Sequence, residues 1–308
     1  MKNYTRLILV ALLLMTSTAW VAAQNVLVNT TKKYPNIKQI EIESGWLEVS
    51  YQGGEGTEIS VEAYLASNVT GQDIVFVTLG DVLKVSYKKS SERYNWNSKN
   101  KGYLKITGPK SMQISVRGSS GKISLTNLVS NNTSLQLTSG TVTASQIKGN
   151  LKLNSTSGTL RASKIDGNVE ARLTSGNAYL DQISGKVNYE STSGSLDAKD
   201  IEGELNVRLT SGNAQIENAK QLGQLYFTSG NMRAVNSAFG PSTQFSGTSG
   251  NFTVQTQADL RNYNYSLKAG SGNIRVGNSS SSRTLELNNN ASTWIKGNIT
   301  SGNITIEN

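Results

Sequence analysis

Apolar residues recur along most of this chain with a period of 18 residues. Within each period they alternate with polar residues in short runs, and glycine stands where the alternation changes phase. Spacing by two is typical of a β-strand with one buried face, and glycine tolerates the backbone angles of a sharp corner. The pattern therefore predicts that each period forms one coil of short strands separated by corners.

The tripeptide Thr-Ser-Gly marks this period and occurs eight times. Five consecutive intervals between Ser-Gly glycines, from Gly140 to Gly230, are 18 residues long, and the later intervals are 20, 22 and 30 residues. A second glycine stands midway in four of the repeats, at Gly149, Gly167, Gly185 and Gly203. Repetition on this scale predicts an all-β, single-stranded β-solenoid, with room for about ten coils from Gly121 to the C-terminus.

Two apolar columns of the aligned repeats exchange volume. Wherever one column holds a large residue, the other holds alanine two positions away, as in the pairs Val142/Ala144, Leu160/Ala162, Ala178/Leu180, Leu196/Ala198 and Ala214/Ile216. Protein interiors fill at nearly crystalline density, so side chains that share one interior must trade volume in this way. The exchange predicts that both columns point into the solenoid.

The chain divides into three parts by pattern. Residues 1–23 carry a basic start, an apolar run and a small-x-small site at Val21-Ala22-Ala23, as in a secretory signal peptide that is cut before Gln24. Residues 24–118 alternate less regularly and are expected to form irregular first coils or a β-rich cap. Residues 119–308 form the regular solenoid, which we expect to be continuous with residues 24–118. The pattern predicts a bacterial protein that is exported to the periplasm, the cell surface or the exterior.

Composition narrows the chemistry. The chain has no cysteine and no histidine, and histidine is the commonest metal ligand and general base. We therefore expect no cofactor, no metal site and no catalytic residues. The formal net charge is +9, and it falls to +7 when Lys2 and Arg6 leave with the signal peptide, which favours anionic partners. No stretch after the signal is apolar enough to predict a transmembrane segment, and no nucleic-acid-binding module is recognised.

The central region resembles a known family. Alternating short strands lead into Ile106–Val116, which is followed by Ser120-Gly-Lys-Ile-Ser-Leu125 and by serial Thr-Ser-Gly coils. This arrangement is similar to the bacterial putative-adhesin β-solenoid family, whose related head domains are named for a Gly-Ile-Asn-type motif. The resemblance implies the solenoid architecture and an adhesin-like surface protein, and it brings no catalytic residues.

The main alternative to a non-enzymatic surface protein is an enzyme that acts on acidic polysaccharide, because parallel β-helices also occur in such enzymes. Glycoside hydrolysis needs two carboxylates at a fixed separation on one face. The acidic residues here are scattered over four columns of the repeat, at Asp166 and Glu202, Asp181, Asp197, and Asp200. Basic residues lie among them, which is typical of a solvated, ion-paired face. The pattern favours a non-enzymatic protein.

One segment differs from the repeats because it mixes five basic residues with four aromatic ones, between Tyr87 and Tyr103. Aromatic faces stack on sugars, and lysine and arginine hold anionic groups. The candidate interaction surface comprises Arg93, Tyr94, Trp96, Lys99 and Lys101. The alternative is a solvated hairpin loop, with Tyr87 and Tyr103 anchoring the strands beside it.

Three functions remain open from the sequence. The leading hypothesis is a non-enzymatic envelope or surface protein that binds an acidic glycan or another envelope protein. The others are a polysaccharide-active enzyme and a purely structural periplasmic spacer. The sequence does not predict an oligomeric state.

Overall fold

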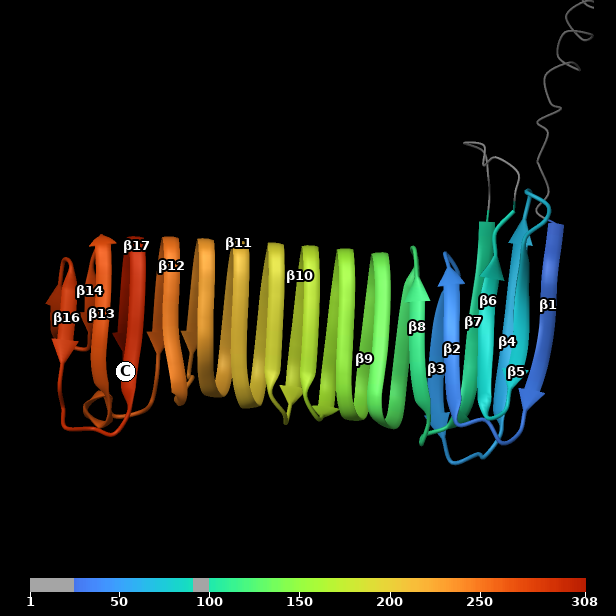
Figure 1. Ribbon diagram of the computed structural model, residues 1–308, viewed down its shortest axis with the longest axis horizontal. Coiled ribbons are helices and arrows are strands. Elements are labelled where there is room, and N and C mark those ends of the chain that lie inside the picture. Colours follow the sequence, from blue (N-terminus) through green and yellow to red (C-terminus); the bar gives the residue numbers. More distant parts are fainter. Residues whose placement is uncertain (1–24, 91–99) are drawn as a thin grey trace, which may run out of the picture.

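The computed structural model describes residues 25–90 and 100–308. In these residues the regular structure is almost entirely strand, and the only helical turn is the short η1 (Leu260–Asn262). Figure 1 shows the strands as coils stacked side by side along one axis. The predicted all-β solenoid is confirmed. The predicted signal peptide, residues 1–23, and its cleavage site before Gln24 lie outside the described residues.

The regular coils occupy the middle of the stack. They are formed by β9 (Lys122–Asp166), β10 (Val169–Ile183), β11 (Val187–Val235) and β12 (Phe239–Gln255). β10 pairs in parallel with β9 and β11, so that Val169 lies opposite Leu151 on one side and Val187 on the other. Both offsets equal the 18-residue period, so each coil lies in register on its neighbours.

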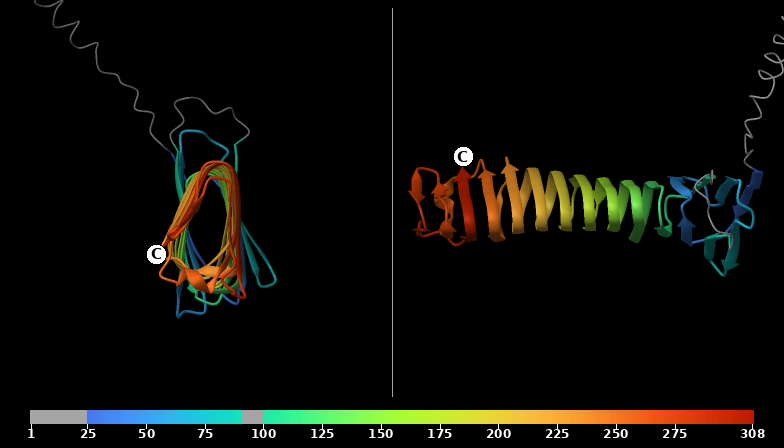
Figure 2. Two further views of the ribbon diagram at one scale, coloured as in Figure 1. Left: turned by 90° about the vertical axis from the view of Figure 1, so that its left-hand side faces the viewer. Right: turned by 90° about the horizontal axis from the view of Figure 1, so that it is seen from above.

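Each coil contributes one run of residues to each of two facing walls, which Figure 2 shows end-on in its left view. We call wall A the one built from the runs after each Ser-Gly step, such as 176–180. Wall B is built from the runs after the mid-repeat glycine, such as 169–173. Because the walls enclose a narrow interior, the apolar alternation of each run faces the opposite wall.

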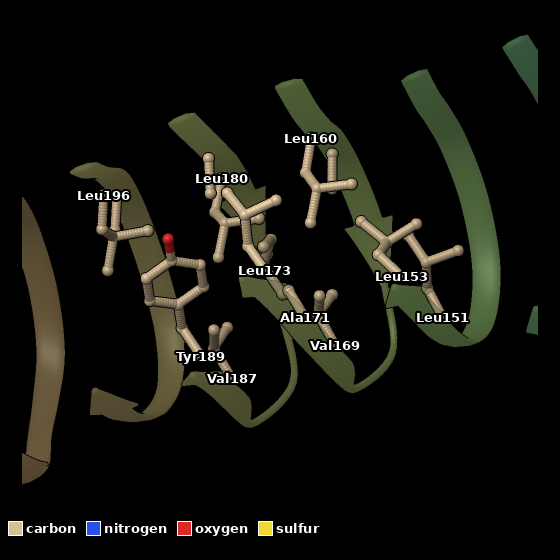
Figure 3. Close-up of a cluster of buried hydrophobic side chains, with 14 of the residues drawn as sticks. Leu151, Leu153, Leu160, Val169, Ala171, Leu173, Leu180, Val187, Tyr189 and Leu196 are labelled. Atoms are coloured by element: carbon tan, nitrogen blue, oxygen red, sulfur yellow. The ribbon is translucent and has the colours of Figure 1, made fainter. Parts of the chain in front are cut away.

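The interior is filled as the volume exchange predicts. All ten side chains of the two exchanging columns are at most 3% exposed. Figure 3 shows Leu160, Leu180 and Leu196 beside Val169 and Val187, all pointing into the same interior. The two columns therefore point inward.

The Ser-Gly corners require glycine. Gly176, for example, has φ +129°, and a Cβ atom added there would lie 2.0 Å from the carbonyl oxygen of Gly158 in the adjacent coil. Backbones approach so closely at this corner that no side chain fits between them. This close approach explains why Ser-Gly recurs at each level from Gly121 onwards.

A further corner was not recognised in the sequence. A polar residue with φ between 50° and 59° precedes a buried residue, most often isoleucine, at the same place in successive coils. These polar residues are Asn127, Gln146, Lys164, Gln182, Asp200, Asn218 and Asn236. Asparagine and aspartate adopt this left-handed conformation more readily than other non-glycine residues. Their side chains also bond from coil to coil, with Asn218 donating to Asp200 (2.7 Å) and Asn236 to Asn218 (2.6 Å). The sequence does carry a signal for this corner. Apolar residues such as Ala162 and Ile165 are three positions apart there, whereas residues on one face of a strand are two positions apart.

Near the C-terminus the coils do not follow chain order. The last strand, β17 (Trp294–Glu307), pairs in parallel with β12 on one side. On its other side it pairs with β13 (Asn264–Ser271) and β14 (Ile274–Val276). The corner glycines accordingly stack in the order Gly250, Gly302, Gly272, which explains the long intervals between them in the sequence. Counted from Gly121 they form ten levels, in agreement with the predicted number of coils.

The N-terminal end is interleaved in the same way. The first coil, β2 (Gln39–Gly45) and β3 (Glu48–Gly54), lies second in space. It is sandwiched between the coil of β6 (Val82–Lys88) and β7 (Asn100–Pro109) and the coil that begins with β8 (Gln113–Gly118) and runs into β9. The predicted boundary between residues 24–118 and 119–308 stays a prediction.

Antiparallel strands close both ends of the stack. These strands are β1 (Asn25–Tyr34), β4 (Ile59–Ser67), β5 (Asp73–Leu79), β15 (Ser279–Ser281) and β16 (Thr284–Leu287). At the N-terminal end, wall A finishes with β7, β4 and β1, and wall B with β6 and β5. At the C-terminal end, β15 closes wall A and β16 closes wall B. Such end strands cover parallel coils that would otherwise present open edges.

Candidate functional site

The outer surface of wall B is hollowed into a groove. Two depressions of about 820 Å³ and about 430 Å³ share Arg172, Glu190 and Arg208, so they form one continuous feature across several coils. We call this feature the groove. Its floor consists of the outward residues of wall B, which alternate with the buried ones. Outward positions recur in every coil, so the groove presents three columns of polar side chains parallel to the stack.

Threonine and amide side chains form two of the three columns. The threonine column is Thr138, Thr156, Thr174, Thr192 and Thr210, and the amide column includes Asn188, Asn206, Gln224 and Gln244. These side chains are fixed by the register of the wall, and Asn206 donates to Asn188 of the adjacent coil (3.1 Å). The groove therefore offers hydroxyl and amide groups repeated at the spacing of the coils.

The charged residues of the groove are largely paired with one another. Arg172 binds Glu190 through its Nε at 3.0 Å and also contacts Glu170 of its own coil. Lys186 binds Glu204 at 2.8 Å. The lining comprises three acidic residues (Glu170, Glu190, Glu204) and three basic ones (Arg172, Lys186, Arg208). The charges of these six residues therefore cancel, and the groove is an ion-paired surface.

Glu204 is the most strongly perturbed carboxylate of the groove. Hydrogen bonds from Lys186, Ser242 and Asn206, in that order of strength, lower the pKa of Glu204 to about 2 from an ordinary value of 4.5. The Ser242 hydroxyl lies 2.5 Å from one carboxylate oxygen, and the Asn206 amide lies 2.9 Å from the other. Glu204 thus ties three coils together while remaining ionised.

We expect the Glu204→Gln substitution to lower the free energy of unfolding by about 1 kcal/mol at pH 7, because it removes charged hydrogen bonds at a partly exposed site. A depressed folded-state pKa stabilises the protein above the unfolded value of 4.5. That contribution disappears as the pH falls towards 2. Urea unfolding at several pH values should therefore show the two proteins converging near pH 2. The same change at the exposed Glu202 serves as a control, and equal losses in both variants would contradict this role of Glu204.

One planar stacking pair lies in the groove. The guanidinium of Arg208 lies over the ring of Tyr226, 4.6 Å from its centroid, and the Tyr226 hydroxyl lies 3.2 Å from that of Thr228. A matching pair, Arg161 over Tyr179 at 4.0 Å, belongs to wall A and lies outside the groove. Arginine–tyrosine pairs present a flat surface on which a sugar ring can stack. The groove was not predicted from the sequence, because the column of Arg172, Glu190, Arg208 and Tyr226 changes in type from coil to coil.

The candidate surface predicted from the sequence lies mostly outside the described residues. Arg93, Tyr94, Trp96 and Lys99 fall there, whereas Lys101 is an exposed residue of β7 opposite Ala66 of β4. Whether these five residues form an interaction surface stays a prediction.

The strands on either side of that segment are firmly anchored. The Tyr87 hydroxyl donates to Gln72 (2.7 Å), Gln72 donates to Ser67 (2.7 Å), and Ser67 donates to Asn100 (2.5 Å). Tyr103 stacks on Tyr64 and donates to Glu62 (2.7 Å). The predicted anchoring by Tyr87 and Tyr103 is confirmed.

The alternative interpretation as a hairpin loop needs a correction. Within the described residues, β6 pairs with β2 and β5, and β7 pairs with β3 and β4. β6 and β7 therefore form the two halves of one coil and do not pair with each other as the strands of a hairpin would.

Two features of the described residues concern metal binding and the membrane. Over residues 25–90 and 100–308, no three acidic side chains come together in a way that could hold a metal ion. In the same residues, no helix is long and apolar enough to span a membrane.

Several solved structures are similar to this chain at low identity. A putative lipid binding protein from Parabacteroides distasonis is 14% identical with a TM-score of 0.46, over 75% of this chain and 94% of that one. A putative cell adhesion protein from Clostridium sporogenes is 10% identical with a TM-score of 0.24, over 91% and 99%. A putative adhesin from Parabacteroides merdae is 18% identical with a TM-score of 0.33, over 74% and 96%. No curated protein matches the chain.

A family model covers nearly all of the coils described above. It matches residues 37–217 and again residues 201–307. The resemblance expected from the Thr-Ser-Gly coils is confirmed by this match. The chain belongs to the Toastrack DUF4097 family.

Proposed function

We propose that this protein is a non-enzymatic binding protein of the bacterial cell exterior and that it holds an extended glycan along the groove. The observation that carries the proposal is the continuity of the groove over several coils of wall B. An extended polymer repeats its own hydroxyl groups along its length, and the groove repeats threonine and amide groups along the stack. Export rests on the signal-peptide pattern of residues 1–23.

The paired charges of the groove favour a ligand without net charge. Lys186 and Arg172 already bind carboxylates, so an acidic polymer would have to displace Glu204 or Glu190 to reach them. Hydrogen bonds from hydroxyl and amide groups carry no such cost. The Arg208–Tyr226 pair adds a stacking surface for a sugar ring.

An acidic glycan remains the ligand expected for the segment that contains Arg93, Tyr94, Trp96, Lys99 and Lys101. That segment gathers basic and aromatic residues with few acidic ones. Binding at the two surfaces should depend differently on salt. Attraction between exposed charges is screened over roughly 10 Å at 0.1 M salt, whereas stacking and neutral hydrogen bonds are not screened.

We expect the purified protein to bind a neutral glucan with little dependence on salt. The Tyr226→Ala substitution should weaken this binding about fivefold to 150-fold, the effect of losing one stacked ring. Tyr179→Ala removes a tyrosine with the same arginine partner geometry from wall A and should leave binding unchanged. Equal binding by both variants would contradict the role of the groove.

Binding of polygalacturonate tests the other surface. If the basic segment is used, Trp96→Ala and the Lys99→Ala/Lys101→Ala pair should weaken that binding, and rising salt should weaken it further. Turnover of polygalacturonate by the purified protein would overturn the non-enzymatic proposal. A protein that binds neither of these glycans nor any envelope protein would instead support the third function, a purely structural periplasmic spacer.

A further inference from the structure

The amide column of the groove covers four consecutive coils of wall B. Its members, one above the other in the stack, are Asn188, Asn206, Gln224 and Gln244. Glu170 lies opposite Asn188 in the coil before this run, and Lys296 lies opposite Gln244 in the coil after it. Charged residues therefore bound a neutral run of amides that is four coils long.

Several polar side chains along this run have no partner in the protein. Within the described residues, the amides of Gln224 and Gln244 and the hydroxyl of Thr210 make no hydrogen bond, and all three side chains are exposed. Asn206 differs, because its amide already donates to Glu204 (2.9 Å). Amide and hydroxyl side chains can each donate and accept hydrogen bonds. The two flanks of the groove thus offer unused groups of both kinds to a ligand.

We propose that the ligand of these four coils is a straight β-1,4-linked glucan, with one sugar ring opposite each coil. This inference rests on the function proposed for the groove. Stacked coils follow one another at the strand spacing of roughly 4.8 Å, and the ring-to-ring repeat of such a glucan is close to that spacing. A straight polymer with this repeat can meet every coil in the same way.

The alternation of the rings fits the two flanks of the groove. Successive rings of a β-1,4-linked glucan are turned by half a turn about the chain axis. Each flank of the groove therefore meets two secondary hydroxyls at one coil and a primary hydroxyl at the next. Both the amide column and the threonine column can bind either kind of hydroxyl, because their side chains donate as well as accept.

An α-1,4-linked glucan has the same composition but a curved chain. Its rings follow a helix, so successive hydroxyls turn away from a straight column. The coils of wall B are stacked along one axis, with each residue opposite its counterpart in the adjacent coil (Figure 1). The groove should therefore distinguish two neutral glucans by their linkage alone.

Titration calorimetry with cello-oligosaccharides of two to six rings tests this inference, with malto-oligosaccharides of the same lengths as the matched series. We expect the affinity for the cello series to rise about threefold to tenfold with each ring up to four, the effect of about one net hydrogen bond. From four to six rings the affinity should change less than about twofold. Maltotetraose should bind at least about tenfold more weakly than cellotetraose.

Two variants locate the contact on the amide column. Gln224→Ala and Gln244→Ala should each weaken cellotetraose binding about threefold to tenfold, because each removes an unpaired amide beside the sugar. Gln215→Ala is the control, since Gln215 is an exposed glutamine of the same coil as Gln224 but lies on wall A. It should leave binding unchanged. Thermal unfolding by circular dichroism checks that all three variants keep the parent fold.

The inference and the proposed function fail in different ways. Equal affinity for the two series, a steady rise in affinity up to six rings, or an equal loss in Gln224→Ala and Gln215→Ala would overturn the inference. Binding of a long neutral glucan without binding of cellotetraose would also overturn it, while the groove would remain a glycan site. A protein that binds neither series and no long neutral glucan would contradict the proposed function itself.

Discussion

The Gly176→Ala substitution should destabilise the protein by about 4 kcal/mol or more, which is exceptional for the addition of one methyl group. The new Cβ would lie 2.0 Å from the carbonyl oxygen of Gly158, and the residue would keep a φ of +129° that alanine rarely adopts. The obstacle is backbone of the adjacent coil, which is itself packed against Gly140. Relief would therefore require several levels of the corner to shift together. Guanidinium unfolding followed by circular dichroism measures the loss.

Substitutions at two other glycines distinguish the stability cost of the steric clash from the cost of the backbone angle. Gly80 has φ +61°, with open space around its Cβ position, and Gly56 has open space and no positive φ. We expect Gly80→Ala to cost about 1–2 kcal/mol through its left-handed conformation alone, and Gly56→Ala to be nearly neutral. A Gly176→Ala protein as stable as the Gly80→Ala protein would show that the coils do not approach as closely as the corner implies.

The Leu180→Ala substitution should cost roughly 2–5 kcal/mol, the usual range for truncating a buried leucine. Leu180 is 1% exposed, and its coil already places alanine at the neighbouring inward position, Ala178. The truncated coil would have two alanines where the coils above and below have one large residue, so a cavity would remain. Chemical denaturation of the variant and the parent protein gives the difference directly.

The double substitution Ala178→Leu/Leu180→Ala tests the exchange itself. It restores the volume of the coil but moves the leucine to the other column, as in the coils that carry Leu160 and Leu196. We expect it to recover part of the loss, because both columns open into one interior and the adjacent coils already mix the two arrangements. A double variant less stable than Leu180→Ala would mean that the columns fill separate spaces. A loss below about 0.5 kcal/mol for Leu180→Ala would place the residue on the surface.

Much of the regular stack could be read from the sequence, because its determinants are local and repeated. The alternation of Leu151, Leu153 and their counterparts identifies the inward face of each run. The glycines at 18-residue intervals identify the corner, because a close approach of backbones leaves no room for any other residue. Each such signal recurs in every coil, so a pattern that is ambiguous in one copy becomes specific over several.

The order of the coils at the two ends was decided by the tertiary structure. The residue pattern of β17 does not indicate that this strand lies between β12 and β14, because the Thr-Ser-Gly pattern is shared by the coils. The choice is made by long-range contacts, such as the hydrogen bond from Asn303 to Asn251 (2.8 Å). Interleaving lets antiparallel strands take the outermost positions, which a plain chain-order stack would leave to another coil.

Of the two candidate sites, one can be recognised in the sequence and the other depends on the tertiary structure. The basic and aromatic residues around Trp96 stand together in the sequence, so the sequence alone could propose them. The groove brings together Arg172, Glu190, Arg208 and Tyr226, which are 18 residues apart and chemically different, and only the register of the coils makes them neighbours. Local periodicity thus determined the coil and its interior, while pairing between distant strands decided the order of the coils and the groove.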